Sequence, residues 1–124
     1  MDYETEVLRF LREEPSLVIY NKLLKELGAA PAMFIAYLAE KFFRVSPTFD
    51  GYITVSIEEM EKEMCFKRGR QESSIKALKK NKYITMKPKE GSRKRQFKLL
   101  FQNFDPDGSY RTAIKNQIAK EIEI

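Results

Sequence analysis

The chain has 124 residues, of which 43% are hydrophobic and 12% are aromatic, and its formal net charge at pH 7 is +5. This length and this apolar content predict one folded domain with a single core and exclude an intrinsically disordered chain. Because the chain has no histidine and only one cysteine, the composition excludes histidine-based nucleophile pairs, histidine metal sites and zinc clusters of cysteines.

Several features are typical of a cytoplasmic protein. The acidic start, MDYETEVLRF, lacks the basic-then-apolar order of a signal peptide, and the longest apolar run, residues 29–39, is too short to span a bilayer. A single cysteine, Cys65, fits a reducing compartment. Since Met64 and Phe66 flank Cys65, we expect its side chain to be a small part of the core.

The N-terminal half predicts three helices. Apolar residues at helical spacing predict an amphipathic helix over residues 3–13. Asn21 is a suitable N-cap for a second helix that ends at Leu27, and Gly28 is a suitable stop after it. The third helix covers residues 31–44 and has a proline in its first turn. It is apolar nearly all round, which predicts a place in the middle of the domain.

A short strand and a capped helix follow. An Asp-Gly pair predicts a turn, and the β-prone run of residues 52–55 predicts a strand. Ser56, with Glu59 three residues later, forms a capping-box pattern. This pattern predicts the start of a helix that continues to Met64.

Positive charge is concentrated in residues 67–98. This segment holds thirteen of the 23 basic residues and two of the 18 acidic residues, so its net charge is +11, whereas the remainder carries −6. The apolar pattern divides it into a helix (68–81), a strand (83–87), a basic turn (88–95) and a second strand (96–101). A basic helix followed by a basic hairpin is typical of a domain that binds a phosphate backbone.

The order of these elements resembles a known superfamily. The string SIEEMEKEMCFKRGRQESSIKALKKNKYITMKPKEGSRKRQFKLLF resembles the second helix, recognition helix and wing of winged helix-turn-helix proteins. The wider frame of NKLLKELG, PAMFIAYLAEKFF and DGYITVS is similar to the N-terminal domains of phage and plasmid replication initiators and of DnaD-type primosome proteins. Three positions differ from the usual residues: Lys67 replaces a Ser or Thr N-cap, Gln71 an inward aliphatic residue, and Lys82 a glycine.

The resemblance implies an α+β fold. This would be a winged helix-turn-helix with a three-helix core, a small antiparallel sheet with a basic wing, and additional N- and C-terminal helices. We therefore expect residues 1–104 to form a winged-helix domain with an N-terminal helical extension, and residues 105–124 to form a C-terminal helix.

The basic surface predicts binding of double-stranded DNA, in replication initiation or transcriptional regulation. The helix would enter the major groove while the wing contacts the backbone. A 100° helical wheel places four residues inward: Gln71, Ser74, Ile75 and Leu78. Arg70 is the candidate for reading bases, because its planar fork can donate two bonds at once. The predicted DNA-binding residues are Lys67, Arg68, Gly69, Arg70, Ser73, Lys76, Lys80, Lys87, Lys89, Arg93, Lys94 and Arg95.

Other interpretations of the charge remain open. The hairpin lysines are also consistent with a solvated sheet edge, and the whole basic face could bind an acidic protein partner without DNA. The acidic cluster at residues 58–63 predicts a solvated helix face. Asp105-Pro106-Asp107-Gly108 resembles the start of a calcium loop, but Asn116 stands where that loop needs Glu, so we expect a turn. No catalytic group, metal or cofactor is predicted, and we expect no enzyme activity and no membrane partner.

The C-terminal segment predicts a helix with one apolar ridge. Tyr110, Ile114, Ile118 and Ile122 recur at four-residue spacing. Such a ridge either packs on its own domain or pairs two chains, because an aliphatic ridge left in water is unfavourable. We predict a homodimer through the terminal helices, with the replication or transcription machinery as further partners.

Overall fold

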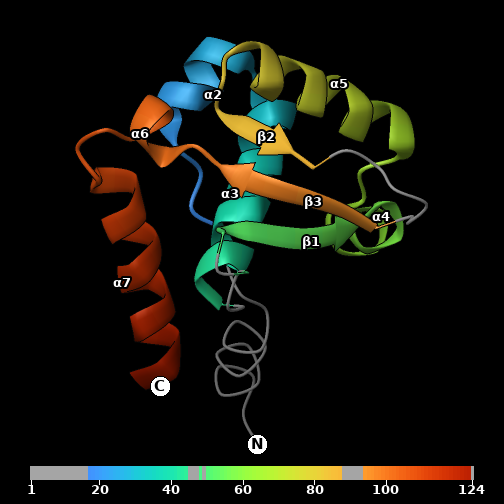
Figure 1. The fold of residues 1–124 in the computed structure, drawn as a ribbon. Coiled ribbons are helices and arrows are strands. Elements are labelled where there is room, and N and C mark those ends of the chain that lie inside the picture. Colours follow the sequence, from blue (N-terminus) through green and yellow to red (C-terminus); the bar gives the residue numbers. More distant parts are fainter. Residues whose placement is uncertain (1–16, 45–47, 49, 88–93, 124) are drawn as a thin grey trace, which may run out of the picture.

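The structure is a computed structural model that describes residues 17–44, 48, 50–87 and 94–123, without the side chains of residues 122 and 123. The described part of the chain is α+β and contains six helices and three strands. In chain order they are α2 (Asn21–Leu27), α3 (Ala29–Arg44), β1 (Tyr52–Ser56), α4 (Ile57–Met64), α5 (Arg68–Lys80), β2 (Ile84–Met86), β3 (Lys94–Leu99), α6 (Phe101–Phe104) and α7 (Ser109–Glu123) (Figure 1).

The strands form one antiparallel sheet in the order β1-β3-β2. In the central strand β3, Phe97 lies opposite Ile53 of β1 and Leu99 lies opposite Ile84 of β2. Side chains alternate between the two faces of a strand, so Phe97 and Leu99 share one face, and both are buried. That face packs against α3, which runs behind the sheet in Figure 1. Phe34 of α3 meets Phe97 edge-on, with ring centroids 5.8 Å apart.

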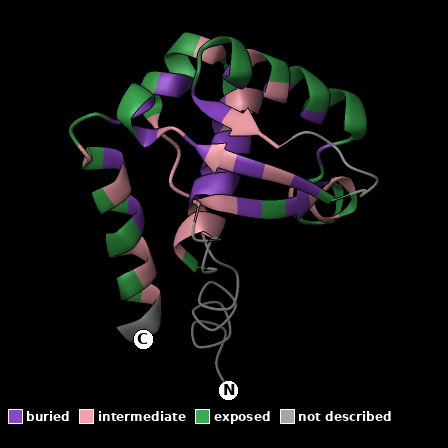
Figure 2. Cartoon of the chain, viewed as in Figure 1, coloured by how far each residue is buried: buried purple, intermediate pink, exposed green. Residues whose placement is uncertain are grey.

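The central helix of the core is α3, as its nearly uniform apolar sequence predicts. Figure 2 shows it buried through the middle of the molecule. Gly28, with φ of 91°, ends α2 as predicted, and Pro31 lies in the first turn of α3. The buried residues of α3 are Ala32, Phe34, Ile35, Ala36, Tyr37, Leu38 and Ala39.

The predicted order of elements from residue 21 to the second basic strand is confirmed. The capping box is present, since the Ser56 hydroxyl accepts a hydrogen bond from the Glu59 N–H at 3.0 Å. The Glu59 carboxylate pairs with the Lys41 ammonium of α3 at 2.9 Å, which ties α4 to α3. The helix predicted over residues 3–13 lies outside the described residues.

The end of the second basic strand differs from the prediction. The predicted strand over residues 96–101 is shifted, because β3 begins at Lys94 and ends at Leu99. Phe101 opens the short helix α6, which the sequence did not predict. The rings of Phe101 and Phe104 lie 5.3 Å apart, and both residues are buried. The helical turn places two aromatic residues three positions apart on the core side, which a strand could not do.

The prediction that Cys65 is a core residue is wrong. Cys65 is exposed, and it ends α4 in the left-handed conformation with φ of 57°. A left-handed residue is the common way to terminate a helix, and here it reverses the chain between α4 and α5. Its apolar neighbour Phe66 is buried instead, with 2% of its surface exposed.

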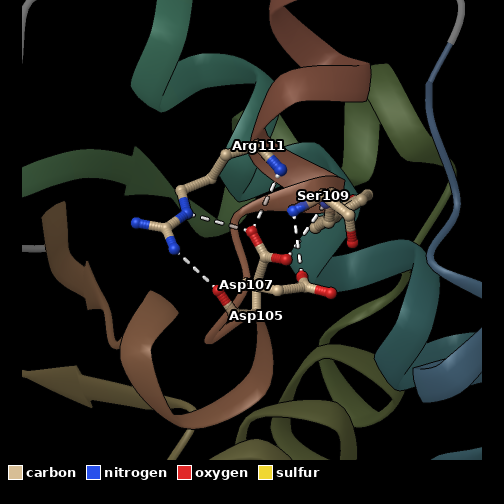
Figure 3. A network of polar contacts seen from close by, with 5 residues as sticks. Asp105, Asp107, Ser109 and Arg111 are labelled. Atoms are coloured by element: carbon tan, nitrogen blue, oxygen red, sulfur yellow. Dashed lines mark hydrogen bonds and ion pairs between the residues drawn. The ribbon is translucent and has the colours of Figure 1, made fainter.

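The segment Asp105-Pro106-Asp107-Gly108 is a turn that starts α7. Figure 3 shows the Asp105 carboxylate at its centre. This side chain is fully buried and accepts hydrogen bonds from the Tyr110 N–H, the Arg111 N–H and the Arg111 Nε, each at 3.0 Å. Asp107 accepts from the Ser109 N–H at 3.0 Å. These carboxylates satisfy N–H groups that the first helical turn leaves without partners, and they favour the positive end of the helix dipole.

The helix α7 folds back on its own domain. The Tyr110 ring stacks on Tyr20 with centroids 4.7 Å apart, and its hydroxyl donates to the Val18 carbonyl at 2.6 Å. Ile114 is 3% exposed, and Ile118 packs half-buried against the same core. Most of the predicted ridge therefore contacts its own chain, and the homodimer stays a prediction. Within the described ranges, no helix combines the length and apolarity needed to cross a membrane.

Candidate nucleic-acid interface

The basic helix α5 has one buried side and one exposed side, as the helical wheel predicts. Gln71, Ser74 and Leu78 are fully buried, and Ile75 is half-buried. The outward residues are all exposed, and the helix itself lies along the upper edge of Figures 1 and 2. We call them the outer face of α5: Gly69, Arg70, Ser73, Lys76 and Lys80.

Polar contacts of Gln71 position the N-terminal part of α5. The Gln71 Nε2 donates to the Phe66 carbonyl at 2.7 Å and to the Ile57 carbonyl at 3.1 Å. These bonds link the first turn of α5 to both ends of the α4 region. Lys67 is exposed and precedes the helix in an extended conformation without a side-chain cap bond. Buried amide contacts at Gln71 thus hold the helix start, where the resemblance to winged helices predicts an N-cap hydroxyl and an inward aliphatic residue.

Arg95 differs from its predicted place on the wing surface. Only 4% of its surface is exposed. Its Nη2 donates to the Gln71 Oε1 at 2.7 Å, its Nε donates to the Val55 carbonyl at 3.3 Å, and its guanidinium lies over the Phe97 ring at 5.3 Å. The expectation that Arg95 extends from the wing to DNA is therefore corrected. Its side chain turns inward because Arg95 shares the inward face of β3 with Phe97.

Two arginines at the start of α5 have different environments. The Arg70 guanidinium lies over the Phe66 ring, 5.6 Å from its centroid, which orients an exposed side chain without using its donors. Arg68 pairs with Glu72 at 3.5 Å, and both side chains are 68% exposed. An exposed pair of this kind contributes little to stability. Both arginines keep N–H donors that can reach a ligand.

The Lys87 side chain contacts β1 and the turn that precedes β1. Its ammonium pairs with Asp50 at 2.9 Å and lies 4.6 Å from the centroid of the Tyr52 ring. Hydrogen bonds from the Thr48 hydroxyl and then from Lys87 hold the pKa of Asp50 below its usual value. Lys87 therefore helps to fix the start of the hairpin, and a phosphate would have to compete with Asp50 for it.

Only part of the predicted wing can be placed. Lys94 is exposed at the first position of β3. Lys89 and Arg93 lie outside the described residues. The basic surface that the structure describes is therefore the outer face of α5 with Lys67, Arg68 and Lys94 at its margins.

The prediction missed one basic side chain beside this surface. Lys79 is exposed and lines a groove between α5 and the sheet, together with Arg68 and Lys76. The helical wheel could have indicated it, because Lys79 lies close to the direction of Arg68 and Glu72. Only the packing of α5 against the sheet makes this side of the helix border a concave surface.

Acidic side chains do not gather as metal ligands would. Across residues 17–44, 48, 50–87 and 94–123, no group of three or more Cys, Asp or Glu side chains could hold a metal ion. Of the acidic cluster on α4, Glu58 and Glu61 are exposed, and Glu63 accepts a hydrogen bond from the Tyr37 hydroxyl.

Comparisons with protein-family models, with curated proteins and with solved structures find no match to this chain.

Proposed function

We propose that the chain is a winged helix-turn-helix protein that binds double-stranded DNA. The fold part of the proposal is supported by the order of α3, β1, α4, α5, β2 and β3 and by the antiparallel order β1-β3-β2. In that scheme α5 is the recognition helix, and β2 and β3 flank the wing. The role would be replication initiation or transcriptional regulation in the cytoplasm.

The outer face of α5 is the observation that carries the DNA proposal. It offers basic side chains at Arg70, Lys76 and Lys80, and small residues at Gly69 and Ser73 between them. Small residues let a helix approach base edges closely, and an α-helix fits the major groove. A cation face interrupted by small residues is a better match to a groove than to a solvated surface.

Each basic residue has an expected task. Arg70 would read a guanine through two bonds to O6 and N7, because its ring contact already orients the fork. Lys76, Lys80 and Lys94 would contact phosphates, which fixes register without reading sequence. Arg95 has no direct contact with DNA in this proposal, because it borders the groove between α5 and the sheet and is not part of the outer face of α5.

Salt dependence tests the proposal most directly. Contacts to five or six phosphates give a slope of roughly −5 in a plot of log affinity against log salt concentration. Fluorescence anisotropy with a labelled duplex library, followed by selection of the bound sequences, measures both slope and preference. No duplex binding at about 50 mM salt would contradict the proposal and favour an acidic protein partner.

Two substitutions separate base reading from phosphate contact. Arg70→Ala should cost about 1–3 kcal/mol on the selected duplex and relax preference at one base pair. Lys80→Ala should weaken all duplexes alike and make the salt slope shallower by about one. Lys120→Ala is the matched control, because it removes one exposed charge from α7, remote from α5 in Figure 1. Equal losses for Arg70→Ala on all sequences would show that α5 does not read bases.

A further inference from the structure

We propose that the groove between α5 and the sheet binds an acidic peptide segment of a protein partner through carboxylates and one apolar anchor side chain. This groove opens on the side of α5 that borders the sheet, and it shares Lys76 and Lys80 with the outer face proposed for DNA. It gives the protein a second ligand and does not depend on the DNA proposal.

The groove combines an apolar floor with a basic rim. This open groove has a volume of about 510 Å³ and is bordered by α4, α5, β2 and β3. Three aliphatic side chains form its apolar part: Ile57, Ile75 and Met86. Five basic residues and one acid complete the lining: Arg68, Lys76, Lys79, Lys80, Arg95 and Glu72. The groove therefore favours a ligand that carries negative charge and an apolar group together.

Arg95 supplies a built anionic subsite in the wall of this groove. Its side chain is 96% buried, and its only hydrogen-bond acceptors among the described residues are the Gln71 amide oxygen and the Val55 carbonyl. No carboxylate of the described chain forms an ion pair with it, and Glu58 and Glu72 act on it only at longer range. A buried guanidinium has five N–H donors and is costly without a counter-ion. A carboxylate in the groove would supply the missing charge.

The dimensions favour a peptide over a small organic anion. The lining residues of α5 run from Arg68 to Lys80, and this distance is about 18 Å at 1.5 Å per residue. About five or six residues of extended chain cover that length. Four further cations, Arg68, Lys76, Lys79 and Lys80, follow the rim, so the ligand needs several carboxylates.

The apolar floor distinguishes this ligand from DNA. Phosphate contacts are made by cations and backbone N–H groups and gain nothing from Ile57, Ile75 and Met86. A leucine or phenylalanine flanked by glutamates would bury its side chain on this floor while the carboxylates reach the rim. The same combination of apolar anchor and charged rim occurs at protein-protein contacts.

The test is fluorescence anisotropy of the full chain with a labelled peptide in which Leu-Phe is flanked on each side by three glutamates. Two variants address the groove. Lys79→Glu reverses a rim charge on an exposed side chain, and Met86→Ser removes part of the floor without a change in charge. Ser73→Glu is the control, because it adds one acid on the outer face of α5. Circular dichroism and duplex binding are measured on each protein.

We expect Lys79→Glu to weaken peptide binding roughly tenfold. Met86→Ser should weaken peptide binding less and retain most duplex binding, because it changes no charge. Ser73→Glu should weaken duplex binding and leave peptide binding nearly unchanged. The proposal is overturned by equal binding of a peptide with Gly-Ser in place of Leu-Phe, or by unchanged peptide binding in both groove variants. Full displacement of the peptide by excess octanoate would assign the groove to a small organic anion, and an equal loss of duplex binding in Met86→Ser would assign it to DNA.

Discussion

The pair Gln71 and Arg95 is the polar centre of the contact between α5 and the sheet. Both side chains are buried, and the Arg95 Nη2 donates to the Gln71 Oε1 at 2.7 Å. The Gln71 amide also donates to two carbonyls next to α4. One amide therefore joins α4, α5 and β3, in a place where an aliphatic residue would only fill space. We infer that Gln71 is present because Arg95 is buried beside it.

Replacing only one member of this pair should be costly. Gln71→Leu leaves the Arg95 guanidinium without its amide acceptor, so we expect the free energy of unfolding to fall by about 2–3 kcal/mol. The double variant Gln71→Leu with Arg95→Met removes both partners and should recover most of that loss. Urea unfolding of the four proteins of the cycle gives the coupling energy. Additive losses would show that the two side chains act independently.

The raised pKa of Tyr83 predicts that the protein loses stability at alkaline pH. The Tyr83 hydroxyl donates to the Glu26 carboxylate of α2, and burial, followed by this hydrogen bond, raises the pKa of Tyr83 from 10.0 to about 12. A raised pKa means that the folded state favours the neutral phenol. The resulting stabilisation is complete below pH 10.0 and is lost as the pH rises towards 12.

Tyr83→Phe tests this linkage. The variant should be less stable than the natural chain by about 1 kcal/mol at pH 8, because it lacks the hydrogen bond. The difference in the free energy of unfolding between the two proteins should become smaller between pH 10 and 12, because only the natural chain has the Tyr83 phenol, which ionises in this range. Burial also raises the pKa of Tyr37 and Tyr110, but both residues are present in the two proteins and cancel in the comparison. A difference that is constant with pH would contradict the linkage.

At the scale of elements, the turns on either side of α5 contain two residues in an unfavourable conformation. Cys65 and Lys82 both have positive φ, 57° and 59°. The left-handed conformation is unfavourable by roughly 1 kcal/mol or more for a residue with a Cβ, whereas glycine has no such penalty. Lys82 is the position at which the resemblance to winged helices predicts glycine. The two turns keep their geometry because the elements around them are packed.

Cys65→Gly should therefore raise the free energy of unfolding by about 1 kcal/mol. The exposed thiol has no core contact to lose, so the conformational term dominates. Cys65→Val is the opposite control, because a β-branched side chain is strongly disfavoured at positive φ, and it should destabilise by a similar amount. Thermal unfolding at one protein concentration under reducing conditions compares the three proteins. A less stable glycine variant would show that the thiol makes a contact in solution.

Helices with strong local signals were predictable from the sequence. The uniform apolar pattern of α3, the glycine after α2 and the Ser56 capping box each depend on residues within one or two turns. Cys65 was placed wrongly because its apolar neighbours suggested burial, whereas a helix end turned it outward. The short helix α6 was missed because Phe101 continues the strand alternation of Phe97 and Leu99, and only tertiary packing of aromatic rings decides between strand and helix there.

Half of the candidate site followed from the helical wheel, and the other half depended on which face of β3 turns inward. The outer face of α5 could be listed from a 100° rotation per residue. Arg95 could have been placed by the same alternation that placed Phe97 and Leu99, since all three share one face. The charge of Arg95 suggests a surface position, but its position in the strand alternation places it inward. To predict the groove, one must know how α5 lies relative to the sheet, and no local sequence pattern gives that information.

Across the whole molecule, charge is sorted between surfaces. Residues 67–98 carry +11, whereas the other residues carry −6. At the α7 end of α3, charges of both signs pair, because Arg44 contacts both Glu40 and Glu121. The first contact with a polyanion is therefore expected through the α5 side, since opposite fields steer association.

The helix α7 is expected to be part of the core and not an accessory. Ile114 is 3% exposed in the same cluster as the residues of α3, so Ile114→Ala should lower the free energy of unfolding by about 2–4 kcal/mol. Ala113→Ser is a control on the same helix, because Ala113 is exposed and should change stability little. Urea unfolding of the three proteins measures both effects.

Sedimentation of the natural chain and of Ile118→Glu tests the predicted homodimer. Ile118 is the ridge residue with a described side chain that is only half-buried, so a partner chain would have to cover it. If the terminal helices pair two chains, the charge of Ile118→Glu should convert a dimer into a folded monomer at micromolar concentration, because an unpaired carboxylate in an apolar contact is strongly unfavourable. Monomeric sedimentation of both proteins would contradict the homodimer. The apolar ridge of α7 would then serve its own core alone.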